Sequence, residues 1–516
     1  MTEDVVRRAG PREWIGLALL VLPMLALSTD LTVLFLALPT VSADLEPTAS
    51  QALWIVHVYG FLIAGFLVTM GRLGDRIGPR RLLLIGSAAF ALLSVLAAFS
   101  TTASMLIAAR AMLGVAGATL MPSLFSLLRV MFHDDVQRRS AIAIMFSSFS
   151  AGGAVGPLLG GALLEHFWWG VVFLINIPPM VLLLVGGRRL LPERTGRGSG
   201  GLDLTSAILS VTGMLAMVYG LQELAAGDQG GGPLWMNALA VGVGILVLAV
   251  FVRRQRRLRD PLFDLALLAN PRVSVSLVTI LLSGVGVVGV FYLLTQHLQW
   301  VVGLSPLRAG LWTVPYILLN IAGSLLAARL TRWIRPVVVV AIGLTLAAAG
   351  LLVLMVVVDP GRSLSVVVAA FSIVGFGQGA AAALVSDLII AGVPDEKTGS
   401  AAAAQEVGGE LGTALGAATG GAVATAVYRG SLGEMMPGGV PDPVGDRALE
   451  SVHDGIAAAR ALGPAGPELL DAVHVAVTDA LQAYAAVAAS LVGLTALLVT
   501  GVLVLRGRGH TPSGGR

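Results

Sequence analysis

The sequence predicts an all-α polytopic membrane protein of fourteen transmembrane helices, in two six-helix halves with two helices inserted between them. Composition is the first observation behind this prediction. The chain of 516 residues is 56% hydrophobic and 12% charged, with a mean hydropathy of +0.87, whereas soluble domains carry about 25% charged residues. The second observation is the length of the apolar runs, about 20 residues each, which is what a helix needs to cross a bilayer. The third is an internal repeat.

Each apolar run in turn predicts one span. The first run follows several charged residues and lacks a small-residue cleavage site, so we expect a membrane span there and no signal peptide. We expect spans at residues 14–39, 51–71, 81–101, 103–131, 139–164, 170–191, 204–225, 235–252, 272–299, 306–330, 336–358, 363–393, 398–428 and 476–505. We expect three parts: an N-terminal half at 14–191, two inserted helices at 204–252, and a C-terminal half at 272–505.

The loop charges predict the direction of the spans. With the N-terminus in the cytoplasm, 27 of the 33 Lys and Arg residues lie inside and five lie outside, while Arg110 lies within a span. Cytoplasmic loops carry such an excess of positive charge. We therefore expect both termini in the cytoplasm.

A shift of 260 positions aligns the fifth span with the thirteenth. Nine of the 23 positions from Ser140 to Ala162 are identical after the shift. Four glycines are in register: Gly152, Gly156, Gly160 and Gly161 align with Gly412, Gly416, Gly420 and Gly421. Two parallel six-helix halves around a central site are typical of transporters that work by alternating access.

One predicted extracellular loop is long. Residues 429–475 hold seven acidic residues and three arginines. We expect an irregular stretch from Pro437 to Pro443, a short amphipathic helix at 445–462, and a spacer or lid-like hairpin overall.

Three segments carry motifs. Residues 71–81 predict a tight cytoplasmic loop, because glycines permit the turn and arginines hold it at the anionic leaflet. Its marked residues are Gly71, Asp75, Arg76, Gly78 and Arg80. The fourth span carries Arg110 and Gly114. The fifth span carries Gly152, Gly156, Pro157 and Gly160, which predict a small-residue face for helix contact and a bend at the proline.

Buried ionisable residues are the candidate functional groups, because an ionisable group inside the membrane needs a partner, a cavity or a role in transport. Asp30, His57 and Arg110 all lie roughly 10 Å below the outer surface, counting about 1.5 Å per helical residue. They could therefore meet in the N-terminal half. We expect Asp30 to bind protons and, together with Arg110, to line the substrate cavity, and a fixed Asp30–Arg110 structural pair is the alternative. His57 is either a proton relay or a hydrogen-bonded interface histidine.

The thirteenth span adds two acids on one helix face. Glu406 and Glu410 are four residues apart, and a ladder of small residues lies on another face. We expect at least one of the two to bind protons or a cationic substrate, with helix–helix hydrogen bonding as the alternative. Asn320 is a further candidate for the substrate cavity.

These motifs together resemble the major facilitator superfamily. The fourteen spans and the strings Asp30-Leu31-Thr32-Val33 and Phe173-Leu174-Ile175-Asn176-Ile177-Pro178 resemble its fourteen-span drug–proton antiporters, the EmrB/QacA-like multidrug exporters. The resemblance covers the chain from about Trp14 to Arg506. It implies the major facilitator fold, antiport, and a location in the bacterial cytoplasmic (inner) membrane. His57 and Asn320 stand where some quaternary-ammonium exporters carry an acid.

Other functions lack their sequence signals. The segment 392–398 lacks the second glycine of a nucleotide-binding loop, and seven scattered histidines and no cysteine give no metal-ligand spacing. We therefore expect a transporter and no enzyme, without cofactor or metal, driven by the proton gradient. The expected partners are protons, the lipid bilayer and a lipophilic, cationic drug or dye, with no nucleic acid, and we expect a monomer. Export of an endogenous antibiotic or other metabolite is the alternative.

Overall fold

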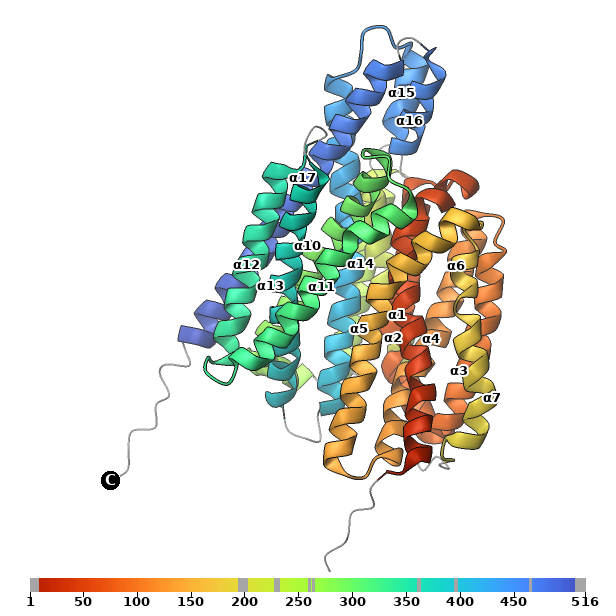
Figure 1. The fold of residues 1–516 in the computed structure, drawn as a ribbon, viewed down its shortest axis with the longest axis vertical. Helices are drawn as coiled ribbons and strands as arrows, with labels where there is room; N and C mark the ends of the chain where they lie inside the picture. The colour runs from red at the N-terminus through yellow and green to blue at the C-terminus, as the bar shows by residue number, and fades with distance from the viewer. Residues whose placement is uncertain are drawn as a thin grey trace, which may run out of the picture. The chain divides into compact units, whose positions relative to one another are not determined.

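The computed structural model describes residues 9–193, 203–226, 233–258, 261, 265–359, 363–393, 398–463 and 466–505, and every regular element in these ranges is helical (Figure 1). The elements are α1 (Pro11–Leu45), α2 (Ala49–Ile77), α3 (Pro79–Ala98), α4 (Ala103–Met131), α5 (Asp135–His166), α6 (Val171–Leu174), α7 (Ile177–Leu190), α8 (Leu204–Ala226), α9 (Leu234–Gln255), η2 (Leu265–Ala269), α10 (Pro271–Trp300), α11 (Pro306–Leu330), α12 (Pro336–Val357), α13 (Leu364–Ala391), α14 (Thr398–Glu434), α15 (Asp442–Glu450), α16 (Val452–Ala461), α17 (Gly466–Leu498) and η5 (Val499–Leu505).

The predicted multi-pass helical architecture is confirmed, but the predicted count of fourteen spans is not. Among the described residues, twelve helices are long and apolar enough to cross a membrane. The helix α2 is bent by 54° between Trp54–Leu67 and Thr69–Ile77, and counting it as one span gives thirteen. The helix α8 contains only a shorter apolar helix, Leu204–Gly220.

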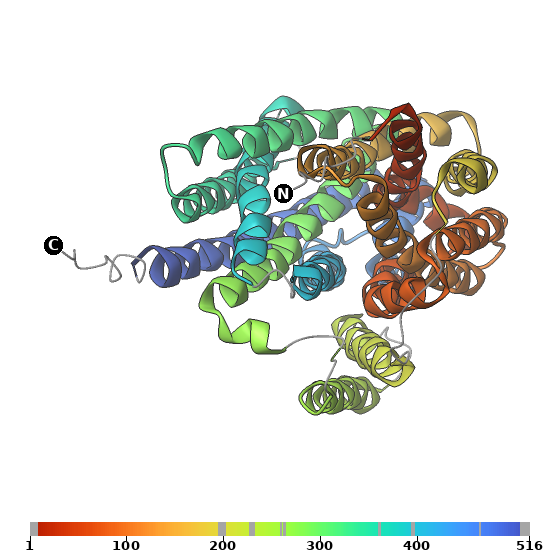
Figure 2. The same ribbon diagram turned by 90° about the horizontal axis from the view of Figure 1, so that it is seen from below.

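The chain divides into two compact units, which are described separately. Unit 1 consists of Met1–Leu215, Leu246–Phe251 and Ser305–Leu311, and unit 2 of the remainder. In unit 1, α1 packs along α5, α2 packs along α4, and α3 packs on α4 and α7. The helices α1 to α7, red to yellow in Figure 2, are seen there close to end-on. The predicted three-part division of the chain stays a prediction.

Glycines bring α5 into backbone contact with α1. A Cβ atom on Gly152 would lie 2.6 Å from the carbonyl oxygen of Leu25, and one on Gly156 would lie 3.1 Å from that of Thr29. The Thr29 hydroxyl donates a hydrogen bond to the carbonyl of Gly152 at 3.2 Å. The small-residue face of α5 thus lies against α1, next to the turn that carries Asp30.

The tight glycine turn predicted within residues 71–81 is present, but the predicted span ends at residues 71 and 81 are wrong. The helix α2 continues to Ile77, and α3 begins at Pro79. A single residue, Gly78, joins them with a φ of 99°, in the left-handed region that favours glycine. A reversal at one glycine is enough because Pro79 is preorganised for the first turn of the next helix. Arg80 donates to the carbonyl of Leu191 at 3.3 Å, which ties this turn to the end of α7.

Unit 2 uses the same glycine contact. The helix α14 packs along α10, and α17 packs against both. A Cβ atom on Gly416 would lie 2.7 Å from the carbonyl oxygen of Val285, and one on Gly412 would lie 2.8 Å from that of Leu281. The Tyr484 hydroxyl lies 2.8 Å and 2.9 Å from the carbonyl oxygens of Val285 and Gly416, so it bridges the two helices.

The predicted hairpin at 429–475 is a small helical cap with its own core. The single helix expected at 445–462 is wrong, because two helices, α15 and α16, meet at Ser451. They pack on the extended ends of α14 and α17 (Figure 1). The Tyr428 hydroxyl donates to the carbonyl of Ala448 at 2.9 Å. The cap core consists of Tyr428, Leu432, Ala448, Ala459, Leu469, Ala472, Val473, Ala476 and Val477.

The glycine contact in unit 2 makes a prediction about stability. Gly416→Ala should destabilise the protein by about 1–3 kcal/mol, because backbone atoms of α10 cannot move aside for an added methyl group. Thermal unfolding of the purified protein in detergent measures this change. Gly408→Ala is the matched control on the same helix, since its nearest neighbours lie 3.9 Å from the added Cβ. Equal melting temperatures for the two variants would contradict close backbone contact between α14 and α10 at Gly416.

Candidate functional site: a buried carboxylate, guanidinium and amide

Asp30 lies in the interior of unit 1, on α1, with none of its surface exposed. Its two carboxylate oxygens have different partners. Oδ2 accepts a hydrogen bond from Nη1 of Arg110 in a buried ion pair. Oδ1 accepts one from Nδ2 of Asn176 at 2.9 Å. The carboxylate therefore joins α1 to α4 and to the junction between α6 and α7.

Arg110 is buried, with 1% of its surface exposed, and it makes three kinds of contact. Its Nη1 bonds Asp30, and its Nε donates to the carbonyl oxygen of Ile55 at 3.2 Å. Its Cζ lies 4.4 Å from the ring centroid of Tyr59 and 5.7 Å from that of Phe173. Aromatic faces attract a guanidinium, more strongly when it is desolvated. The positive charge therefore keeps partners even without the carboxylate.

A glycine explains how Arg110 reaches α2. Gly114 is one turn beyond Arg110 on α4, and a Cβ atom there would lie 2.5 Å from the carbonyl oxygen of Tyr59. Only glycine permits this approach of α4 to α2. The close contact sets the guanidinium against the Ile55 carbonyl and the Tyr59 ring.

Asn176 is the member of the cluster that the sequence reading did not single out as a site residue. It is fully buried between α6 and α7. Its Oδ1 has no hydrogen-bond partner in the part of the chain that the structure describes. The available signal was an amide in an apolar run directly before the helix start Ile177-Pro178-Pro179.

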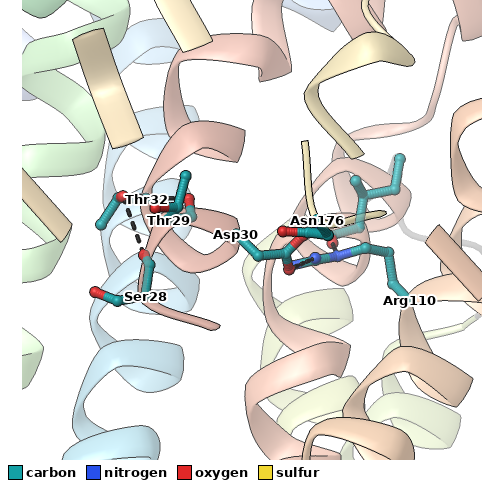
Figure 3. A network of polar contacts seen from close by, with 7 residues as sticks. Ser28, Thr29, Asp30, Thr32, Arg110 and Asn176 are labelled. Carbon is teal, nitrogen blue, oxygen red and sulfur yellow. Dashed lines mark hydrogen bonds and ion pairs between the residues drawn. The ribbon is translucent and has the colours of Figure 1, made fainter. Parts of the chain in front are cut away.

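The close-up in Figure 3 separates two faces of α1. Asp30 extends toward Arg110 and Asn176, whereas Ser28, Thr29 and Thr32 gather on the other side of the helix. These hydroxyl residues face the glycines of α5. The carboxylate is thus the polar group that α1 directs into unit 1.

His57 lies on α2, two residues after Ile55, and is 2% exposed. Its Nε2 has no hydrogen-bond partner among the described residues. The predicted meeting of Asp30 and Arg110 is observed directly, and His57 belongs to the helix that contacts Arg110. The alternative, a hydrogen-bonded histidine at a helix interface, has no support at Nε2 among the residues that the structure describes.

Where the structure describes their side chains, the other predicted site residues take no part in this cluster. Asn320, on α11 in unit 2, donates to the carbonyl oxygen of Gly375 at 3.1 Å. Glu406 and Glu410 fall within α14, but their side chains lie outside the described residues. Asp75 and Arg76 are exposed near the end of α2.

Burial decides what this cluster can do chemically. Taking an ion pair out of water costs several kcal/mol per ion, and close geometry with further hydrogen bonds must offset it. Here the carboxylate accepts hydrogen bonds from Arg110 and Asn176, and the guanidinium donates one to the Ile55 carbonyl. These bonds supply the compensation. A proton added to Asp30 would remove one charge of the pair, while Arg110 would keep its carbonyl and aromatic contacts. The arrangement can therefore hold a proton or release it without leaving a charge unsupported.

Comparison with known proteins adds a family and relatives. Residues 20–417 match the family model of the Major Facilitator Superfamily. The chain is 41% identical over 500 residues to the multidrug efflux pump LfrA of Mycolicibacterium smegmatis, which covers 97% of this chain and 98% of the relative. It is 32% identical to the methyl viologen resistance protein SmvA of Salmonella typhimurium, over 90% of this chain and 92% of the relative. It is 34% identical to the puromycin resistance protein pur8 of Streptomyces alboniger, over 78% and 80%.

A solved structure has the same fold. The crystal structure of a bacterial homologue of the human lysosomal transporter Spinster, inward-facing and unoccupied, superposes with a TM-score of 0.66. The alignment covers 96% of this chain and 98% of that one at 15% identity. At this identity the likeness shows the fold alone.

The buried ion pair makes a prediction about coupling between its members. Arg110→Met alone should destabilise the protein by about 3–5 kcal/mol, because it leaves the Asp30 charge buried and unpaired. Asp30→Leu should cost less, because the Ile55 carbonyl and the Tyr59 ring still contact the guanidinium. The double variant should be more stable than either single variant. Thermal unfolding of all four proteins in one detergent measures the coupling as a double-mutant cycle. Additive effects would contradict a tight pair.

Proposed function

The chain belongs to the major facilitator superfamily, and from that premise we propose that it is a proton-coupled antiporter. It exports lipophilic cationic drugs or dyes across the cytoplasmic membrane by alternating access. One observation carries the proposal: a fully buried carboxylate, Asp30, held by Arg110 and Asn176 inside an apolar helical unit. The relatives named as a multidrug efflux pump and a methyl viologen resistance protein support drug export.

Proton exchange at Asp30 follows from the two states that its partners allow. The carboxylate is stabilised by Arg110 and Asn176. When water reaches the site from the acidic side, the carboxylate takes up a proton and its attraction to Arg110 weakens. The Tyr59 ring and the Ile55 carbonyl then hold the guanidinium. Release of the proton on the other side restores the pair, so Asp30 alternates with the direction of access.

The cationic substrate needs a carboxylate to attract it, either Asp30 itself or a second acid. Glu406 and Glu410, four residues apart on α14, are the acids proposed to attract the cation or a second proton. Asn320 is proposed to line the cavity, and His57 to relay protons near Arg110. The conformational role of the α2–α3 turn and of the α5 glycines belongs to the same proposal.

Several finer features stay part of the proposal. We propose that the chain belongs to the fourteen-span EmrB/QacA-like group, with α2 and α8 as the additional spans. We also propose that both termini lie in the cytoplasm, because the cytoplasmic loops would then carry most of the arginines. The protein works as a monomer and needs no cofactor, since the proton gradient drives it. Export of an endogenous antibiotic or other metabolite is the second candidate, supported by the relative named as a puromycin resistance protein.

The proposal predicts proton movement on addition of a lipophilic cation. Inverted membrane vesicles that carry the protein, energised to be acid inside, should release protons when ethidium is added. Asp30→Asn should lower this release to the level of vesicles without the protein, because an amide cannot exchange a proton at this site. A pH-sensitive dye inside the vesicles measures the release.

A matched acid separates the site from a general loss of charge. Asp387→Asn changes an exposed acid on α13 in the same chemical way and should retain the response. Release that survives in a folded Asp30→Asn protein would contradict coupling through Asp30. Absence of release from the parent with every lipophilic cation tried would contradict cation export and favour the metabolite exporter.

A further inference from the structure

Asn176 directly precedes a helix but cannot cap it in the usual way. It directly precedes α7, where an asparagine side chain normally accepts a hydrogen bond from the backbone N–H of the second or third helical residue. In α7 those residues are Pro178 and Pro179, and proline has no N–H to donate. The Asn176 side chain makes no capping bond to its helix.

The amide is therefore available for another partner, and its neighbourhood supplies one. Nδ2 donates to Oδ1 of Asp30 at 2.9 Å, between residues 146 positions apart in the chain. Oδ1 of Asn176 is fully buried and has no hydrogen-bond partner within the described ranges. A buried acceptor left without a hydrogen bond is unfavourable, because it has lost its bonds to water without replacing them. Because this oxygen lies next to the Asp30 carboxyl, which can bind a proton, the state in which it could accept a hydrogen bond is the one with Asp30 protonated.

We infer that Asn176 is a positioning residue that matches both protonation states of Asp30. With the carboxylate, Nδ2 donates to Oδ1 of Asp30, as the structure shows. When a proton from water adds to that same oxygen, a half-turn of the amide brings its own Oδ1 to accept the new O–H. Arg110 keeps its hydrogen bond to Oδ2 in both states. This inference rests on the proposed proton exchange at Asp30 and adds the group that makes both states acceptable.

The geometry favours protonation at Oδ1 of Asp30 over Oδ2. Oδ2 faces Nη1 of Arg110, a guanidinium that only donates hydrogen bonds. Oδ1 faces an amide, which offers a donor on one side and an acceptor on the other. A proton on Oδ1 therefore finds an acceptor after the amide turns, whereas a proton on Oδ2 would oppose the donors of Arg110.

The test measures Asp30 protonation without requiring transport. The purified protein, reconstituted in lipid, is titrated with pH while infrared difference spectroscopy follows the carbonyl band of the protonated carboxyl. The band that disappears in Asp30→Asn belongs to Asp30. In Asn176→Leu the midpoint of its titration should move to alkaline pH by about one unit, because hydrogen bonds to charged groups are the stronger ones. The pH profile of vesicle exchange should move with it.

The position of the same band provides a second signature. In Asn176→Leu the protonated carboxyl loses the acceptor of its O–H, so its carbonyl band should move to higher wavenumber. Asn176→Asp keeps the shape of the side chain and tests the site if the leucine variant does not fold. Two adjoining carboxyls share one proton, so this variant should hold a proton to higher pH than Asn176→Leu does.

A matched substitution and two separate outcomes complete the test. Asn237→Leu removes another fully buried asparagine, on α9, and should leave the Asp30 midpoint and band position unchanged. An Asp30 band that titrates in the parent but is unaffected by both Asn176 variants overturns this inference alone. A parent with no titrating Asp30 band overturns proton exchange at Asp30 and the inference with it.

Discussion

The ion pair between Asp30 and Arg110 is the contact on which the interior of unit 1 depends. Two opposite charges in an apolar bundle are tolerated only while each has partners. Arg110 draws on the Ile55 carbonyl and the Tyr59 ring, and Asp30 on Asn176. The pair thus ties together α1, α2, α4 and the junction of α6 with α7. The same ties make the site responsive, because one proton changes the balance at all of these segments.

Close backbone contact is the second constraint, and both units use it. The glycines of α5 lie against α1, and those of α14 lie against α10. Between apolar helices in a membrane, association depends on such packing, because lipid provides no hydrophobic driving force. In unit 1 the contact brings the far side of α1 up to α5 and leaves Asp30 directed inward. In unit 2 the Tyr484 hydroxyl reaches the carbonyls of both helices at the point of contact.

Counting residues along each span was enough to predict that Asp30 and Arg110 could meet, because helical rise converts sequence position into depth. It could not predict Asn176, whose bond to Asp30 depends on how the chain breaks between α6 and α7. The sequence also predicts the tight turn within residues 71–81, but not that both helices extend until one left-handed residue, Gly78, separates them. The cap was expected as a hairpin with one helix. The Tyr428 hydroxyl bonds the carbonyls of Ala448 and Ser451, where these two helices meet, and such contacts between residues 20 or more positions apart are not visible in the local pattern.

The sequence by itself determined that this is a helical membrane protein, where most of its helices lie, and that Asp30, His57 and Arg110 are buried. These properties follow from composition and from the period of one helix, which act locally along the chain. Only the tertiary structure decided which buried groups touch, that Asn176 joins them, and where α2 and α8 depart from regular spans. Such contacts depend on how closely two helices approach each other. Single glycines such as Gly114 and Gly152 set that distance, because an added Cβ would collide with the backbone of a helix from a distant part of the chain.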